Sequence, residues 1–209
     1  MYDLPYFKEK DQHVVREFIR DHPFATLIGC LGNVPVATQV PVLIGDGEKG
    51  LLLRGHMMRN TDHHKAFTEN SDALCVFSGA HTYVSASWYS NPQTGSTWNY
   101  MSVHARGTLR FLGEPELLAI LEETTARFEN DENSPALFRH LPKVYVDSLK
   151  NAIIAFELEV RKLENVFKLS QNRDESSYDN IMAKLHAQGG DALTIAEEMR
   201  KRRAEIFRR

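Results

Sequence analysis

The chain has 209 residues, of which 42% are hydrophobic and 25% are charged. This ordinary globular composition supplies a core and excludes a disordered or collagen-like chain. The net charge is −3, but residues 200–209 hold six basic groups and one acidic group, which leaves a balance of −8 on the rest. An acidic body does not favour wrapping by nucleic acid, and a basic end is most often simply the C-terminal end of a helix.

The first half of the chain predicts short apolar strands separated by turns. A helix capped by Asp11 carries Val15, Phe18 and Ile19 on one face and ends before Pro23. Strands are then expected at residues 24–30, 35–44, 51–56, 73–77 and 81–88, and a short helix capped by Thr61 reaches about residue 70. Cys30 and Cys75 lie within apolar strand segments, which is typical of buried free thiols in a reducing compartment.

The second half begins with a polar loop at residues 90–97. The expected elements that follow are a long strand at 98–112, bent near Gly107, a helix at 115–128, an irregular stretch with short helical pieces at 129–150, a strand at 152–169, and helices at 178–187 and 191–209. Six or seven strands with short connections and peripheral helices predict an antiparallel barrel, in the mainly β part of the α+β class.

Several functional classes lack their sequence signals. The N-terminus has no signal peptide pattern and no apolar run is long enough to cross a bilayer, so we expect a soluble cytoplasmic protein with no membrane contact. The phosphate loop, the dinucleotide fingerprint, the HExxH and CxxC patterns and the nucleophile elbow are absent. His56, His81 and His104 lie on or near strands, where hydrogen-bonded histidines are a commoner explanation than a metal site. No catalytic residue is therefore assigned.

Three segments point to a ligand. RGHMMRNTDHHKAF (54–67) ends a strand and begins a helix with Arg59, Asn60 and Thr61, which suits either a phosphate or an ordinary capped turn. YVSASWY (83–89) and TWNYMSVHARG (97–107) carry both tryptophans beside polar residues, which suits either a flat ligand or a structural hairpin. KLSQNR (168–173) follows the last strand and either lines a pocket or forms a loop.

Together these segments resemble a PaiB-type protein, a bacterial family of FMN-binding negative transcriptional regulators. The matching stretches are MYDLPYFKEKD, FATLIGC, PVATQVP, GHMMRN, FSGAHTYVSASWY, TWNYMSVHARG and KLSQNR, in family order. The resemblance implies an FMN-binding split barrel, related to pyridoxamine phosphate oxidases and usually homodimeric, with the flavin at the subunit interface. It places the split-barrel domain at residues 1–170 and a C-terminal helical extension, packed on the barrel, at 171–209.

The resemblance also implies a cofactor site. Its predicted residues are Thr38, Gln39, His56, Met57, Arg59, Asn60, Thr61, Lys65, Trp98, Asn99, Lys168, Gln171 and Arg173. Arg59, Asn60 and Thr61 would hold the phosphate, the His56 and Met57 backbone would face the flavin, and the last five residues would approach from the partner subunit. Where the family continues after the arginine with a small residue, Asn-Pro and an aromatic, this chain has NTDHHKAF, which predicts FMN affinity in the micromolar range or weaker.

The function expected from the resemblance is that of an FMN-binding negative regulator. The alternatives are a flavin-dependent oxidoreductase and, less favoured, a haem-binding split barrel. The two C-terminal helices loosely resemble a helix-turn-helix, so direct DNA contact is a further possibility. A hairpin packed through Ile181, Leu185, Leu193, Ile195 and Met199 is the preferred interpretation.

Overall fold

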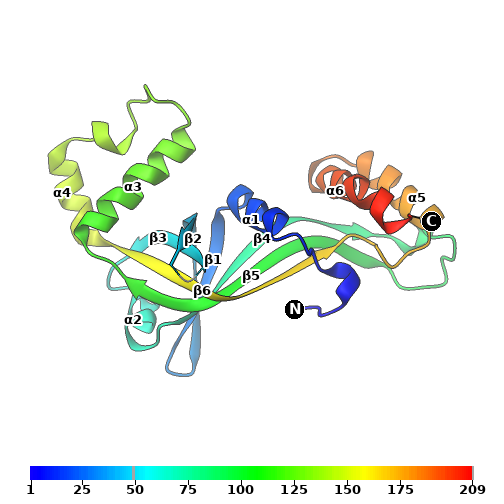
Figure 1. Cartoon of the computed structure of the whole chain (residues 1–209), viewed down its shortest axis with the longest axis horizontal. Coiled ribbons are helices and arrows are strands. Elements are labelled where there is room, and N and C mark those ends of the chain that lie inside the picture. The colour runs from blue at the N-terminus through cyan, green and yellow to red at the C-terminus, as the bar shows by residue number, and fades with distance from the viewer. Residues whose placement is uncertain (49, 209) are drawn as a thin grey trace. The chain divides into compact units, whose positions relative to one another are not determined.

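The computed structural model describes residues 1–48 and 50–208 and contains six antiparallel strands that close a barrel (Figure 1). The strands are β1 (Phe24–Leu31), β2 (Val34–Gly47), β3 (Gly50–Met58), β4 (Asp72–Val84), β5 (Thr97–Phe111) and β6 (Ile153–Lys168). Their order around the barrel is β1-β2-β3-β6-β5-β4. This confirms the predicted mainly β architecture.

The helices lie before, between and after these strands in the chain. They are η1 (Pro5–Phe7), α1 (Gln12–Asp21), α2 (Asp62–Glu69), η2 (Ala86–Trp88), α3 (Glu114–Glu129), η3 (Phe138–His140), α4 (Lys143–Ala152), α5 (Glu175–His186) and α6 (Gly190–Ile206). Figure 1 shows α5 and α6 side by side as a C-terminal hairpin. Among residues 1–48 and 50–208, no helix has both the length and the apolar character needed to span a bilayer.

The chain forms two compact units, each built from separate stretches of sequence. We call residues 19–77 and 104–163 the barrel unit, and residues 1–18, 78–103 and 164–209 the terminal unit. Strands β4, β5 and β6 contribute residues to both units. The predicted domain boundary after residue 170 follows chain order instead, and it stays a prediction.

The barrel unit has an apolar interior and an apolar outer cluster. Along β1 and β3, alternate residues such as Leu27 and Leu53 are fully buried, as expected for strands with one face toward a core. On the outside, α3 packs against β2 and β6 through a cluster of Leu43, Leu117, Ile120, Ile153 and Ala155.

The terminal unit buries one face of the α5–α6 hairpin. Tyr178, Ile181, Leu185, Ile195 and Met199 are fully buried. The Tyr178 hydroxyl donates a hydrogen bond of 2.8 Å to the Met199 carbonyl, so the two helices are also joined by a polar contact. Four of the five residues predicted to face inward do so, and Leu193 is half-buried.

Two local predictions were wrong, on the strands at 73–88 and on the N-cap of α6. Residues 72–84 form one strand rather than two, so Ser78-Gly79 does not interrupt β4, and residues 86–88 form a 3₁₀ turn. The stretch at 129–150, expected to be irregular with short helical pieces, contains η3 and most of α4; α4 has no buried residue and therefore lacks a strong periodic signal. Gly189, not Asp191, lies at the N-cap of α6, and Asp191 is in its first turn.

Gly107 permits a close approach between β5 and β6. A Cβ atom built on Gly107 would lie 2.0 Å from the carbonyl oxygen of Glu159, a backbone atom that cannot turn away. We expect Gly107→Ala to lower the free energy of unfolding by about 2 kcal/mol or more, because overpacking must displace a strand. Gly95→Ala is the control, since its Cβ would meet no atom within 4 Å. Urea unfolding of both variants checks this, and equal midpoints would contradict it.

Candidate functional site

Arg59 is anchored where β3 leads into α2. Its backbone N–H donates to the Ala152 carbonyl and its Nε donates to the Ile153 carbonyl, both at 2.9 Å. The two terminal guanidinium nitrogens have no hydrogen bond or ion pair with any residue that the structure describes. An arginine held through Nε, with its terminal N–H groups free, is suited to bind a phosphate.

The start of α2 is already capped by its own residues. The Thr61 hydroxyl accepts from the His64 N–H at 3.4 Å, and the Asp62 carboxylate accepts from the His63 N–H at 2.8 Å. Asn60 adopts a left-handed backbone with φ of 63°, and its N–H donates to His64 Nδ1. The predicted cap at Thr61 is confirmed. A phosphate at this helix start would therefore meet the negative charge of Asp62, which opposes its binding.

His56 carries an unsatisfied buried nitrogen. Its Nδ1 is buried and has no hydrogen-bond partner in the described chain. Burial lowers the pKa of His56 below 6.5, because the charged imidazolium loses its hydration. A buried polar atom without a partner costs free energy, so this nitrogen points to a partner supplied from outside the chain.

The neighbouring predicted residues differ in their surroundings. Met57 is 3% exposed and belongs to the barrel core, whereas Gln39 and Lys65 are exposed and Thr38 is half-buried. The β2–β3 ladder ends at Val42 and Gly55, and beyond it Met57 pairs with Ile154 of β6. We take Met57 out of the set of side chains able to contact a ligand, while its backbone stays in the proposed site.

Asn99 and Gln171, in the terminal unit, use their amides inside the protein. Asn99 is fully buried, its Oδ1 accepts from the Ser170 hydroxyl at 3.1 Å, and its Nδ2 lies 3.7 Å from the Met199 sulfur. Gln171 accepts from the Leu169 N–H at 2.7 Å and donates to the Phe167 carbonyl at 2.5 Å. Both side chains therefore stabilise the fold, and the proposed flavin site does not include their amides.

Trp98 lies on an exposed aromatic patch. Its side chain is 53% exposed, and its ring centroid lies 6.1 Å from that of Tyr83 and 6.0 Å from that of His81. A hollow of about 370 Å³ is lined by Trp98 and by Ser78, Gly79, His81, Tyr100, Met101 and Ser102. An exposed tryptophan beside a hollow is available to a flat ligand or to another protein surface.

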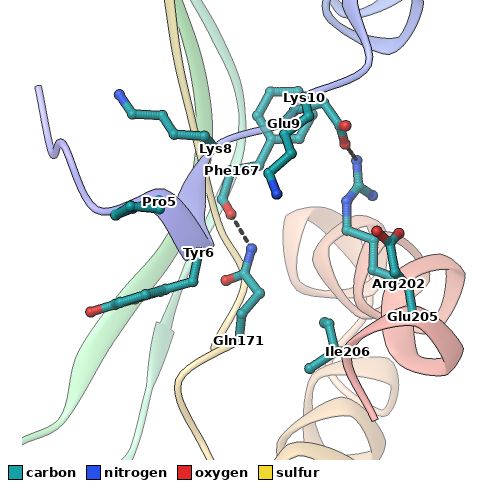
Figure 2. Close-up of a pocket in the computed structure, with 10 residues that line it drawn as sticks. All are labelled: Pro5, Tyr6, Lys8, Glu9, Lys10, Phe167, Gln171, Arg202, Glu205 and Ile206. Carbon is teal, nitrogen blue, oxygen red and sulfur yellow. Dashed lines mark hydrogen bonds and ion pairs between the residues drawn. The ribbon is translucent and has the colours of Figure 1, made fainter. Parts of the chain in front are cut away.

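A pocket of about 360 Å³ lies within the terminal unit (Figure 2). It is lined by Pro5, Tyr6, Lys8, Glu9, Lys10, Phe167, Gln171, Arg202, Glu205 and Ile206. Figure 2 shows Arg202 reaching from α6 to Glu9, with 3.0 Å between the two charged groups. Cations and carboxylates are mixed in this pocket, and the ion pair between Glu9 and Arg202 attaches the N-terminal segment to α6. We therefore assign no ligand to the pocket.

The basic C-terminal segment is largely neutralised by ion pairs. Arg200 pairs with Glu197, Lys201 with Glu198, Arg202 with Glu9 and Glu198, and Arg203 with Glu175 and Asp179. The partners of Arg202 and Arg203 include residues outside α6, so these two cations fix the helix to its surroundings. The segment therefore offers fewer free positive charges than its composition suggests.

Sequence reasoning missed the partners of the predicted residues. Thr97 accepts a hydrogen bond from Lys168, and Tyr89 stacks under Arg173 with 4.0 Å from the guanidinium carbon to the ring centroid. The only available signal was that Tyr89 directly precedes the polar loop at 90–97 and that Thr97 is its last residue. Across the described ranges, no three His, Cys, Asp or Glu side chains are grouped to hold a metal ion.

Comparisons with known proteins define the class. Residues 1–162 match the family described as "Putative FMN-binding domain". The chain is 30% identical over 200 residues to "Protease synthase and sporulation protein PAI 2" of Bacillus subtilis, covering 95% of this chain and 96% of that protein. The chain therefore belongs to this PaiB-type FMN-binding family, as its motifs predicted.

Solved structures show the fold at lower identity. An FAD- and haem-binding protein from Mycobacterium smegmatis is 17% identical with a TM-score of 0.57, covering 77% of this chain and 72% of that chain. The flavocytochrome Anf3 from Azotobacter vinelandii is 15% identical with a TM-score of 0.57, covering 80% and 72%. At such identities these neighbours establish the shared split-barrel fold.

Burial of His56 predicts a pH dependence of stability. Because the folded chain holds the proton less tightly than the unfolded chain, lowering the pH below about 6.5 favours unfolding. We expect the loss of unfolding free energy between pH 7 and pH 5 to be smaller in His56→Gln than in the wild type. His186→Gln, at an exposed histidine of α5, is the control. Urea unfolding at several pH values measures this, and an unchanged slope in His56→Gln would contradict it.

Proposed function

We propose that this chain binds FMN at the β3–α2 turn and acts as a negative transcriptional regulator of the PaiB type. The observation that carries the proposal is an arginine anchored through Nε three residues after a buried histidine nitrogen without a partner. FMN offers a dianionic phosphate, a polar ribityl chain and a flat ring with hydrogen-bonding edges. The family model and the Bacillus subtilis relative support the same cofactor and role.

The polar and cationic side chains of the barrel unit have the chemistry that FMN binding requires. Arg59 would bind the phosphate, and Thr38, Gln39, Asn60 and Lys65 supply polar or cationic groups in the same unit. His56 Nδ1 would gain a hydrogen-bond partner, and the adjoining β3 backbone would face the ring. Bound FMN supplies a redox-active ring, while the residues of this chain orient it and keep its phosphate in place. Asp62 supports an affinity in the micromolar range, because it repels the same phosphate.

A homodimer is part of the proposal. The exposed Trp98 and Tyr83 of the terminal unit form an aromatic surface that a second protomer would cover. In the homodimer we expect Trp98 to approach the flavin held by the other protomer. Analytical ultracentrifugation tests the dimer, since a monomer at all concentrations would remove this part of the proposal.

Arg59 provides the sharpest test of flavin binding. Arg59→Gln should weaken FMN binding roughly tenfold to a hundredfold, because charge-assisted hydrogen bonds to the phosphate are lost. Riboflavin, which lacks the phosphate, should bind the variant and the wild type alike. Asp62→Asn, at the same turn, should act in the opposite direction and tighten FMN binding. Fluorescence titration with both flavins measures this, and equal losses for FMN and riboflavin in Arg59→Gln would refute the phosphate role.

The ion pairs of the C-terminal cations predict that α6 does not contact DNA directly. With Arg200, Lys201, Arg202 and Arg203 held by carboxylates, α6 lacks the free positive face that non-specific DNA binding requires. We expect the full chain to cause no mobility shift of duplex DNA at low salt, where phosphate contacts are strongest. A shift that weakens steeply with added salt would show direct DNA contact and contradict this expectation.

A further inference from the structure

A rigid turn follows β6 and fixes two cations of the terminal unit. Ser170 has a left-handed backbone with φ of 63°, and its carbonyl accepts from the Arg173 N–H at 3.0 Å. The Gln171 side chain bonds the backbone of Phe167 and Leu169, which ties the turn to the strand end. These bonds set the backbone positions of Lys168 and Arg173, the first and last residues of the KLSQNR segment.

Lys168 and Arg173 contact neutral groups instead of acids. The Lys168 ammonium donates to the Thr97 hydroxyl and lies 5.5 Å from the Tyr2 ring centroid and 6.0 Å from that of Phe7. Arg173 stacks on Tyr89. Both cations are half-buried, and neither pairs with a carboxylate among residues 1–48 and 50–208. Half-buried cations without a counter-ion are costly, so an anion from outside would stabilise them.

The nearest acid in sequence is engaged elsewhere. The Asp174 carboxylate accepts from the Ser177 N–H at 2.9 Å, from the Ser177 hydroxyl at 2.6 Å and from the Ser90 hydroxyl at 2.9 Å. These bonds cap α5 and lower the pKa of Asp174 to about 2. The basic residues of α6 are the contrast, because Arg200, Lys201, Arg202 and Arg203 all pair with carboxylates.

Two further observations mark this place as incomplete. The Tyr89 side chain is more than nine-tenths buried, and its hydroxyl is buried with no hydrogen-bond partner in the described residues. Burial of Lys168 and the positive charge of Arg173 both lower the pKa of Lys168. Two cations without a carboxylate partner, one of them stacked on a tyrosine whose hydroxyl is unsatisfied, match the chemistry that recognises an oxyanion.

We propose that Lys168 and Arg173 form a second anion site, which binds the phosphate or carboxylate of a ligand other than FMN. The inference rests on the proposed function, because FMN has one phosphate and Arg59 is assigned to it. It replaces the expectation that Lys168 and Arg173 approach the flavin from the partner subunit. A phosphorylated or carboxylated small molecule, as substrate or effector, has the required chemistry. The alternative source of the same chemistry is the flavin phosphate of the partner protomer, and the two sources give different results below.

The test uses the full chain and inorganic phosphate as the probe. Isothermal titration calorimetry measures phosphate binding to apo and to FMN-saturated protein, for the wild type and for Lys168→Gln/Arg173→Gln. We expect phosphate to bind both wild-type forms. With the Arg59 site filled by FMN, the double variant should bind phosphate at least about tenfold more weakly than the FMN-saturated wild type. Lys184→Gln/Arg208→Gln, which removes two exposed cations of the same unit, should bind phosphate like the wild type. Arg173→Lys keeps the charge and should retain part of the affinity.

The outcomes separate the second site from the flavin site. If Lys168 and Arg173 bind a ligand other than FMN, the Lys168→Gln/Arg173→Gln variant keeps the same ratio of FMN affinity to riboflavin affinity as the wild type. A selective loss of FMN affinity in that variant, together with displacement of phosphate by FMN in the wild type, would assign the pair to the flavin phosphate and overturn the proposal. Failure of apo wild type to bind phosphate at millimolar concentration would also overturn it. If the wild type binds phosphate but no FMN, the proposed function fails while the anion site stands.

Discussion

Compensation of positive charge is the constraint on which this account depends. In a chain whose body is acidic, a half-buried cation is stabilised by a carboxylate, by neutral polar groups or by a ligand, and its partner determines what it can do. Arg202 and Arg203 are held by carboxylates and fasten α6. Arg59, Lys168 and Arg173 have no such partner in the described chain. These three are therefore available for anionic ligands.

The same constraint explains why the β3–α2 turn would hold FMN only moderately. The Ala152 carbonyl holds the backbone of Arg59 and the Ile153 carbonyl holds its Nε, so less conformational entropy is lost when the terminal nitrogens bind a phosphate. Asp62 adds an opposing charge at the same helix start. A site with one anchored cation and one nearby acid favours a cofactor that exchanges.

Local patterns in the sequence predicted those structural features that are determined by residues close together in the chain. The cap at Thr61 and the buried face of α5 and α6 follow from spacing within a few residues. The amide of Asn99 is different, because its partners Ser170 and Met199 are 71 and 100 residues away and no local pattern reveals them. The ion pair between Glu9 and Arg202 spans 193 residues, so composition alone made the C-terminal charge look free.

The central claim is that an arginine without a protein counter-ion marks the flavin phosphate site. The most direct measurement is the ratio of dissociation constants for riboflavin and FMN on the wild-type chain, determined by fluorescence titration at low and moderate salt. We predict FMN binding in the micromolar range, at least about tenfold tighter than riboflavin binding, with the difference shrinking as salt screens the phosphate. Equal affinities for the two flavins at every salt concentration would contradict it.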